Sequence, residues 1–323
     1  MHLELAVPGL LGEAAMPRLP SLELLAARGR GEDGTPGTLE RWLMEGFAIK
    51  GESLPAGALT VLAAGRDPGD AFWLRADPVH LEVRSDGVTL TPAARLEIAP
   101  EETAAFAAAL NAHFGGEFEW LALREQCWCV RLAKPLAGAS DAPAGAMGAA
   151  GESFAPGTGA TPVRALATEA QMLLHAHPAN QDRARRGLLS VNSVWLWGAG
   201  PLPGAARAAW RSVSCDDPAA AGLARLAGLR HAALPAGLGQ WREQAPPDGH
   251  HLCLIDALRY ASERERALES MEARWFAPSL AELRADRIGM LTLRDPESGR
   301  RWETTRADLR RFWRRARPLG ATP

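Results

Sequence analysis

The sequence contains little of several residue types, and each shortage narrows what the chain can be. Of its 36 basic residues only Lys50 and Lys134 are lysines, and Tyr260 is the single tyrosine beside 11 tryptophans. Four cysteines among 323 residues do not form a disulfide scaffold, which indicates a reduced, cytoplasmic protein. A formal net charge of −2 gives the whole chain no electrostatic attraction for nucleic acid.

Long apolar runs are also missing. No stretch approaches about 18 uninterrupted apolar residues, which argues against a membrane span. The amino terminus, MHLELAVPGLL, lacks a basic segment and carries Glu4 within its apolar run, so it is a poor secretory signal. We therefore expect a protein that is neither secreted nor embedded in a membrane.

The chain is long enough for about two domains. Alternating strand and helix patterns, clearest in residues 165–323, predict a mostly parallel α/β sheet formed by residues 1–60 and 165–323, with one of its strands at 191–200. A further strand is expected at 58–64. Residues 61–134 interrupt this pattern and predict an inserted α+β unit, with a helix over 100–114 and a hairpin over 118–133. Residues 135–164 are almost entirely small residues and proline, which predicts a linker or mobile loop.

Short motifs that often carry chemistry have a simpler interpretation here. Cys127 and Cys129 share a face of an expected strand, where a metal or redox pair is one interpretation. We favour the interpretation that they are two small buried side chains, because no second Cys or His pair has matching spacing. His177 precedes Pro178 at a helix end, which favours capping over metal binding. The GAGPLPG sequence from Gly198 is interrupted by prolines and does not form a dinucleotide loop.

Polar side chains gather on two expected strands. Asp70, Arg75, Asp77 and His80 occur along one of them, and Asn192 and Trp197 on the other. Ligands bind at the carboxyl ends of strands in a parallel sheet, so these residues are candidates for a site. Trp195 and Trp197 share a face and fit either a buried layer or an aromatic platform.

The last basic segment, ADLRRFWRRAR at residues 307–317, predicts a terminal helix. Its arginines surround Phe312 and Trp313. We favour a helix that docks through its aromatic side chains and leaves its arginines in water. A site for nucleic acid or an acidic partner is the alternative.

Taken together, these segments resemble the archaeal-type cofactor-independent phosphoglycerate mutases, a branch of the alkaline phosphatase superfamily. They resemble more closely a set of bacterial proteins called RpfE-type regulatory proteins. The most specific stretch runs from the HPAN sequence at His177 through Arg183 to NSVWLWGAG at 192–200. The segment from Asp70 to Arg75 is similar to a strand of the mutase's inserted domain. The resemblance implies an alkaline phosphatase-like, mostly parallel sheet flanked by helices, with an inserted smaller α+β unit.

The chain departs from these mutases at the metal centre. The family uses two divalent metals and a Ser nucleophile, which has no clear counterpart here. Its first metal-binding Asp follows strand one, where this chain has Pro8 and Gly9. Two Asp–His ligand pairs of the family read Asp256 with Tyr260 and Asp295 with Pro296, and neither phenol nor proline replaces a neutral nitrogen ligand. We therefore expect no catalytic residue, metal or cofactor, with Asp256 and Asp295 as relics.

This departure implies a non-catalytic, phosphoglycerate mutase-like pseudoenzyme with a regulatory or ligand-binding role; the regulatory part comes only from the family. An active metal-dependent mutase or phosphatase with a rearranged site is the alternative. A phosphorylated or carboxylated metabolite or a protein is the expected partner, and neither nucleic acid nor a membrane is expected. The candidate ligand-binding residues, for which a structural polar network is the other interpretation, are Asp70, Arg75, Asp77, His80, His177, Asn180, Arg183, Asn192 and Trp197.

Overall fold

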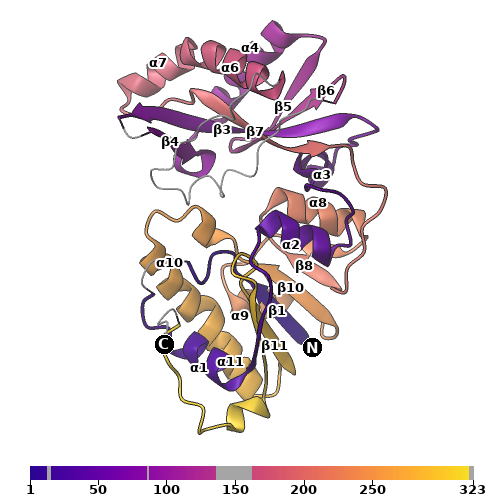
Figure 1. Ribbon diagram of the computed structural model, residues 1–323, viewed down its shortest axis with the longest axis vertical. Helices are drawn as coiled ribbons and strands as arrows, with labels where there is room; N and C mark the ends of the chain where they lie inside the picture. The colour runs from indigo at the N-terminus through magenta and orange to yellow at the C-terminus, as the bar shows by residue number, and fades with distance from the viewer. Residues whose placement is uncertain (13–15, 86, 136–161, 320–323) are drawn as a thin grey trace. The chain divides into compact units, whose positions relative to one another are not determined.

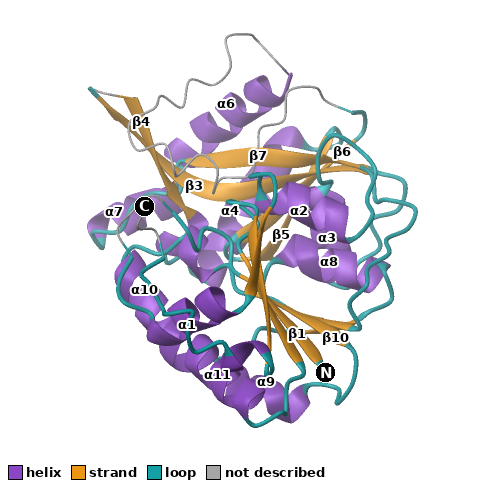
Figure 2. Cartoon of the chain, turned by 60° about the horizontal axis from the view of Figure 1, so that its bottom comes forward, coloured by secondary structure: helices purple, strands orange, loops and turns teal. Residues whose placement is uncertain are grey.

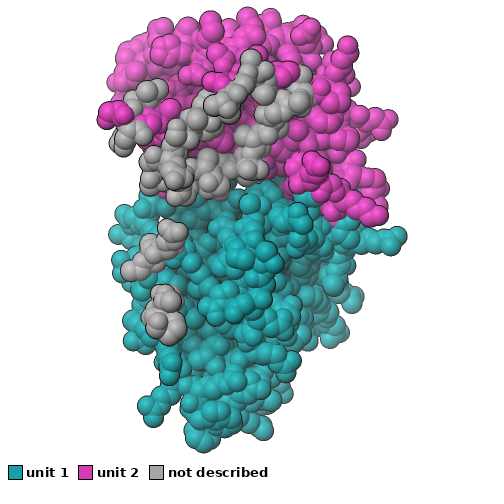
Figure 3. All heavy atoms as spheres, in the orientation of Figure 1, with its two compact units in different colours: residues 1–48, 206–323 teal, residues 49–205 magenta. Residues whose placement is uncertain are grey.

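The computed structural model describes residues 1–12, 16–85, 87–135 and 162–319. The chain forms two compact units, one of Met1–Ala48 with Ala206–Pro323 and one of Ile49–Ala205 (Figures 1 and 3). The second unit is larger than the insertion expected at 61–134, because it also contains the segments on either side of it. Nearly all of the linker or loop expected at 135–164 lies outside the described residues.

A seven-stranded sheet forms the centre of the first unit, in the order β2-β12-β11-β1-β10-β8-β9. The five strands from β11 to β9 are parallel, β12 pairs antiparallel with β11, and β2 at the edge pairs antiparallel with β12. The prediction of a mostly parallel sheet is confirmed. The strands are β1 (His2–Ala6), β2 (Arg30–Asp33), β8 (Ser212–Ser214), β9 (Arg230–Ala232), β10 (His250–Leu254), β11 (Met290–Arg294) and β12 (Arg300–Thr305).

Helices cover both faces of this sheet, with α1, α9, α10 and α11 on one side and α2 and α8 on the other (Figures 1 and 2). Leu3 and Leu5 of β1 face the first group and join its apolar core. Parallel strands buried on both faces are typically apolar throughout, but these strands also contain buried polar residues, among them Glu4, Ser212 and Thr292. The helices are α1 (Pro20–Arg28), α2 (Leu39–Gly46), α8 (Pro218–Leu226), α9 (Leu238–Gln244), α10 (Arg264–Met271) and α11 (Ala277–Arg284), with 3₁₀ turns at Ala257–Arg259 and Asp308–Arg310 and a π-helical segment, Glu272–Phe276, between α10 and α11.

The sheet of the second unit is antiparallel. Its strands are β3 (Phe72–Arg84), β4 (Gly87–Pro92), β5 (Phe118–Arg124), β6 (Cys127–Leu132) and β7 (Ser193–Gly200). The hairpin of β5 and β6 is confirmed. The strand expected at 191–200 is present as β7, but its assignment to the parallel sheet is wrong, because it pairs antiparallel with β3. A strand with apolar residues on both faces fits the interior of either sheet, so its sequence does not select one.

Helices α4 (Pro100–Phe114), α6 (Pro162–His175) and α7 (Pro178–Arg185) cover one face of this antiparallel sheet, and α3 (Ala56–Ala63) covers the other (Figure 1). A 3₁₀ turn spans Ala93–Arg95. The strand expected at 58–64 is instead part of α3, since a short apolar run fits a buried helix equally well. A Cβ at Gly57 would lie 2.7 Å from the backbone of Leu74, and one at Gly198 would lie 2.5 Å from Cβ of Ala56. These glycines let α3 lie directly against β3 and β7.

The prediction of a carboxyl-terminal helix is wrong. Only a 3₁₀ turn at Asp308–Arg310 forms, and an irregular segment follows it. Two arginine side chains instead reach the end of α1, where Arg311 donates a hydrogen bond of 3.1 Å to the carbonyl of Arg28 and Arg314 one of 2.9 Å to that of Gly29. These contacts satisfy carbonyls that a helix end leaves without partners. In the part of the chain that the structure describes, no helix is long and apolar enough to cross a membrane.

Candidate functional site

The first group of predicted residues lies where β3 and β7 face α3. Arg75 forms an ion pair with Asp77, and Nε of Arg75 lies 3.0 Å from Oδ1 of Asp77. Its Nη1 lies 3.2 Å from the hydroxyl of Thr60 in α3. Oδ2 of Asp77 accepts a hydrogen bond of 2.7 Å from the indole N–H of Trp197, and the Arg75 guanidinium lies over that indole, 5.4 Å from its centroid. The structure thus brings together three predicted residues.

This group is buried and closed. The side chains of Arg75 and Asp77 are 7% and 11% exposed. Burial by itself would lower the pKa of Arg75, but several charge interactions, of which that with the Asp77 carboxylate is the largest, together hold that pKa above its usual value. The guanidinium charge is therefore neutralised inside the protein, and an anionic ligand would have to displace Asp77 to reach it. Trp195 and Trp197 form part of a buried layer.

His80 and Asn192 lie further along the same two strands. Nδ1 of His80 is 2.9 Å from the carbonyl oxygen of Ser190. The side-chain amide of Asn192 accepts a hydrogen bond of 2.8 Å from the backbone N–H of Leu81 and donates one of 2.9 Å to its carbonyl. Asn192 therefore continues the pairing of β3 beyond Ser193, the first residue of β7. Both side chains link the backbone of neighbouring segments.

Arg183 of α7 is the most enclosed of the predicted residues, with a side chain that is 0% exposed. Its Nη1 lies 2.5 Å from Oε2 of Glu102 in α4, and its Nε donates a hydrogen bond of 2.8 Å to the carbonyl of Leu189. Nη2 donates to the carbonyl of Leu96. Each edge of the guanidinium therefore has a partner within the unit, and Arg183 holds α7 to α4.

Asn180 lies on α7 together with Arg183, and His177 directly precedes this helix. The amide of Asn180 donates hydrogen bonds to the carbonyls of Leu174 and Val191, at 2.6 and 2.9 Å, and accepts one of 2.8 Å from the N–H of Val191. His177 caps α7, where its Nδ1 accepts a hydrogen bond of 3.2 Å from the N–H of Ala179. The capping interpretation of His177 agrees with this geometry.

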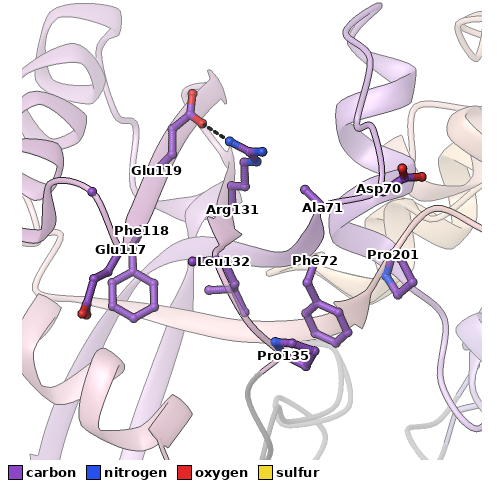
Figure 4. Close-up of a pocket in the computed structure, with 12 residues that line it drawn as sticks. Asp70, Ala71, Phe72, Glu117, Phe118, Glu119, Arg131, Leu132, Pro135 and Pro201 are labelled. Atoms are coloured by element: carbon purple, nitrogen blue, oxygen red, sulfur yellow. Dashed lines mark ion pairs between the residues drawn. The ribbon is translucent and has the colours of Figure 1, made fainter.

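Asp70 lines an open cavity with a volume of about 720 Å³. Figure 4 shows apolar rings along one part of it and the ion pair of Glu119 with Arg131, whose atoms are 3.6 Å apart, at another. The lining carries more carboxylates than guanidinium groups, which is unfavourable for an anionic ligand. Its charged and ring-bearing residues are Asp70, Phe72, Glu117, Phe118, Glu119, Arg131, Pro135 and Pro201.

The two residues predicted to be relics of a metal site, Asp256 and Asp295, lie at the carboxyl edge of the parallel sheet in the first unit. Asp295 follows β11, and its carboxylate accepts hydrogen bonds from the backbone N–H groups of Gly9, Leu11 and Glu297, at 3.0, 2.9 and 3.1 Å. Asp295 is only 1% exposed. Arg264 donates to the carbonyl of Gly9 from its Nη2, at 2.5 Å. Asp295 and Arg264 together fix the loop that follows β1.

Asp256 follows β10 at the same edge. Burial, and then the nearby carboxylate of Asp217, raise the pKa of Asp256 to about 6, although Arg259 opposes this shift. Arg259 also forms an ion pair of 2.9 Å with Glu40. Among the described residues, no group of three or more His, Cys, Asp and Glu side chains is arranged to hold a metal ion.

Glu4 is a buried charged residue that we did not predict as part of any site. It lies within β1, where it accepts hydrogen bonds of 2.9 Å from the indole of Trp210 and 2.8 Å from Arg294, and it lies 3.0 Å from Nε2 of His250. Burial alone would raise the pKa of Glu4, but its close interactions with His250, Arg294 and Trp210 lower it to about 2. A carboxylate in the middle of an apolar strand was the available signal, because such a group requires partners.

The comparisons with known proteins establish a fold. No known protein family and no curated protein matches the chain. The PH0037 protein of Pyrococcus horikoshii matches with a TM-score of 0.57 and 14% identity, over 94% of this chain and 87% of that one. A cofactor-independent phosphoglycerate mutase from Thermoplasma acidophilum matches with a TM-score of 0.45 and 15% identity, over 94% of this chain and 89% of that one. The chain shares its fold with the PH0037 protein, whereas the resemblance to RpfE-type proteins stays a prediction.

Proposed function

We propose that this chain is a cytoplasmic, non-catalytic relative of the phosphoglycerate mutases, with a regulatory or partner-binding role. The observation that carries the proposal is the environment of Asp295. Its carboxylate accepts three backbone N–H groups, at 2.9 to 3.1 Å. A metal-binding carboxylate directs oxygen lone pairs at a cation, and here both oxygens accept backbone N–H groups, two from the loop after β1 and one from Glu297.

The arginines at this edge support the same conclusion. The chain has Pro8 and Gly9 after β1, and Arg264 binds the carbonyl oxygen of Gly9. Arg259 lies in the electrostatic range of Asp256 and forms an ion pair with Glu40. Fixed guanidinium groups supply positive charge at this edge without an exchangeable coordination site, so they stabilise the carboxylates and activate no nucleophile.

The nature of the partner follows from the second unit. A phosphorylated or carboxylated metabolite bound at Arg75 would have to compete with Asp77. The carboxylate of Asp77 already neutralises the guanidinium of Arg75 and accepts a hydrogen bond from the indole of Trp197. The cavity beside Asp70 carries excess carboxylate. We therefore propose a macromolecular partner in preference to an anionic metabolite, and we treat metabolite binding as an outcome that the experiment can reveal.

The experiment measures bound metal, turnover and thermal stability of the purified full chain. Elemental analysis is followed by assays of 3-phosphoglycerate and p-nitrophenyl phosphate with added Mn²⁺ or Zn²⁺. We expect no metal-dependent turnover and no change in Tm with Mn²⁺, EDTA or 3-phosphoglycerate. Asp295→Asn should lower Tm equally with and without metal, because it replaces one of the two acceptor oxygens by an NH2 donor that faces a backbone N–H, at a cost of about 1–3 kcal/mol.

A matched control uses Asp33→Asn, whose carboxylate is exposed and forms a surface ion pair of 2.8 Å with Arg300. Such pairs contribute little, so its Tm should stay close to that of the unmodified chain. Stoichiometric Mn²⁺ or Zn²⁺ together with turnover that is lost in Asp256→Asn and Asp295→Asn would establish the active, rearranged enzyme instead. A Tm increase with 3-phosphoglycerate that Arg75→Met abolishes would restore the metabolite proposal.

A further inference from the structure

Residues 310–317, here called the arginine–aromatic segment, expose two neighbouring aromatic side chains. Phe312 is 76% exposed and Trp313 is 66% exposed, whereas the only other large apolar side chains exposed among the described residues are Met172 and Leu189. The rings of Phe312 and Trp313 lie edge to face, with centroids 5.3 Å apart. Two exposed, adjacent rings are unusual on a surface that has no partner.

The segment is held in place at both of its ends. Leu309, just before it, is 9% exposed and belongs to the apolar core of the first unit, and Leu319, just after it, packs against the same core. Arg28 donates a hydrogen bond of 2.7 Å to the carbonyl of Leu309, and Arg311 donates to the carbonyl of Arg28. The exposed rings therefore belong to an anchored loop, in which ordering has already been achieved before any partner binds.

The charge of the segment is uniformly positive. It contains five arginines, and no acidic residue follows Asp308 in the sequence. Arg310, Arg315 and Arg317 form no ion pair with any residue that the structure describes. Three of the arginines, Arg314, Arg315 and Arg317, line a cavity of about 410 Å³ together with Trp313. The carboxylate of Glu23 also lines it, but Arg18 neutralises this group through two hydrogen bonds of 2.8 Å.

We propose that the arginine–aromatic segment binds single-stranded nucleic acid. Unpaired bases stack on exposed aromatic rings, and phosphates form bidentate contacts with guanidinium groups. The segment provides both chemistries within a few residues, with Trp313 and unpaired arginines around one cavity and Phe312 beside it. The net charge of −2 for the whole chain does not oppose this, since local charge acts within about a Debye length.

Other partners fit the same surface less well. Duplex nucleic acid keeps its bases stacked on one another and leaves the two rings without a function. A membrane-binding segment is typically an amphipathic helix, and here the chain is irregular after Arg310. An acidic protein would use the arginines but would not require two flat aromatic faces beside them.

The experiment titrates the full chain into a fluorescein-labelled oligothymidine of about 16 nucleotides and follows anisotropy at several salt concentrations. Trp313→Ala should weaken binding about 5- to 100-fold without changing the salt dependence, because it removes base stacking. Arg315→Gln with Arg317→Gln should lower the slope of log K against log salt by about 1.4, because each phosphate contact contributes about 0.7. These two variants separate stacking from charge.

Matched controls change the same chemistry elsewhere. Met172→Ala removes another exposed apolar side chain, and Arg66→Gln with Arg225→Gln removes the same charge from exposed positions outside the segment. Both should bind as the unmodified chain does. The proposal fails if the oligonucleotide does not bind, or if Trp313→Ala binds equally well. Polyglutamate and anionic vesicles serve as probes for the other partners. If the arginine double variant loses binding to one of these probes as strongly as to the oligonucleotide, and Trp313→Ala has no effect, the partner is an acidic protein or a membrane instead. This outcome is independent of whether the carboxyl edge of the sheet is catalytic.

Discussion

In each unit a buried carboxylate joins an arginine to a tryptophan, whereas the exposed arginine–aromatic segment has no such link among the described residues. In the second unit Asp77 accepts from Arg75 and from Trp197, and in the first unit Glu4 accepts from Arg294 and from Trp210. In the arginine–aromatic segment, Trp313 lies beside arginines that have no such partner. A cation becomes available to a ligand only where the protein does not neutralise it, which is why the buried groups stabilise the fold and the exposed one is the candidate for binding.

The largest expected effect comes from breaking the buried pair of the second unit. Arg75→Met should destabilise the chain by about 3–5 kcal/mol, because it leaves Asp77 charged and buried without its ionic partner. Chemical denaturation measures this loss. The double variant Arg75→Met with Asp77→Leu should lose much less. If Arg75→Met unfolds like the unmodified chain, the pair does not stabilise the fold and the comparison is wrong.

Acid denaturation tests the buried group of the first unit. The pKa of Glu4 is lowered to about 2 in the folded protein, so its contribution to stability is complete above about pH 4.5 and is lost as the pH falls toward 2. This contribution is on the order of 3 kcal/mol. Urea denaturation across this range should show a steeper loss in the unmodified chain than in Glu4→Gln. Glu32→Gln, at an exposed edge pair with Arg301, should keep the original profile, and identical profiles for all three proteins would contradict the assignment.

A smaller effect tests how tightly α3 closes over Arg75. Gly57→Ala should destabilise by about 1–3 kcal/mol, because its Cβ would lie 2.7 Å from the backbone of Leu74. Gly239→Ala is the matched control, since nothing lies within 4 Å of a Cβ there and alanine is favoured within a helix. Its stability should rise by about 0.5–1 kcal/mol. Equal Tm values for the two variants would mean that α3 does not seal the group.

The smallest effect is expected in the exposed segment. Trp313→Ala should change the free energy of unfolding by no more than about 0.5 kcal/mol, because its ring is 66% exposed. Trp302→Ala, which removes a ring that is 4% exposed on β12, should cost about 3–5 kcal/mol. A large loss in Trp313→Ala would show that the segment docks through its aromatics after all.

Local signals in the sequence predict some elements well. The helix over 100–114 begins at Pro100 with two glutamates in its first turn and ends before Gly115, and the structure has it with these bounds. The hairpin of β5 and β6 and the mostly parallel sheet are likewise confirmed. The prediction of a strand at 58–64 is wrong, because a short apolar run has no periodicity that distinguishes a strand from a buried helix. The sheet to which β7 belongs depends on pairing with β3, which is a contact distant in the sequence.

The sequence by itself determined which charges and rings the chain contains, the class of its main sheet, and that tyrosine and proline rather than histidine follow Asp256 and Asp295 at positions 260 and 296. Tertiary structure alone decided which of those charges remain available. Trp197 reaches Asp77 across 120 positions and Arg294 reaches Glu4 across 290, whereas no carboxylate reaches Arg315 or Arg317 among the described residues. Burial makes an unpaired charge costly, so the fold brings its partners together from any distance along the chain. At the surface, water solvates an unpaired charge, so an arginine there needs no carboxylate partner within the protein and can bind another molecule.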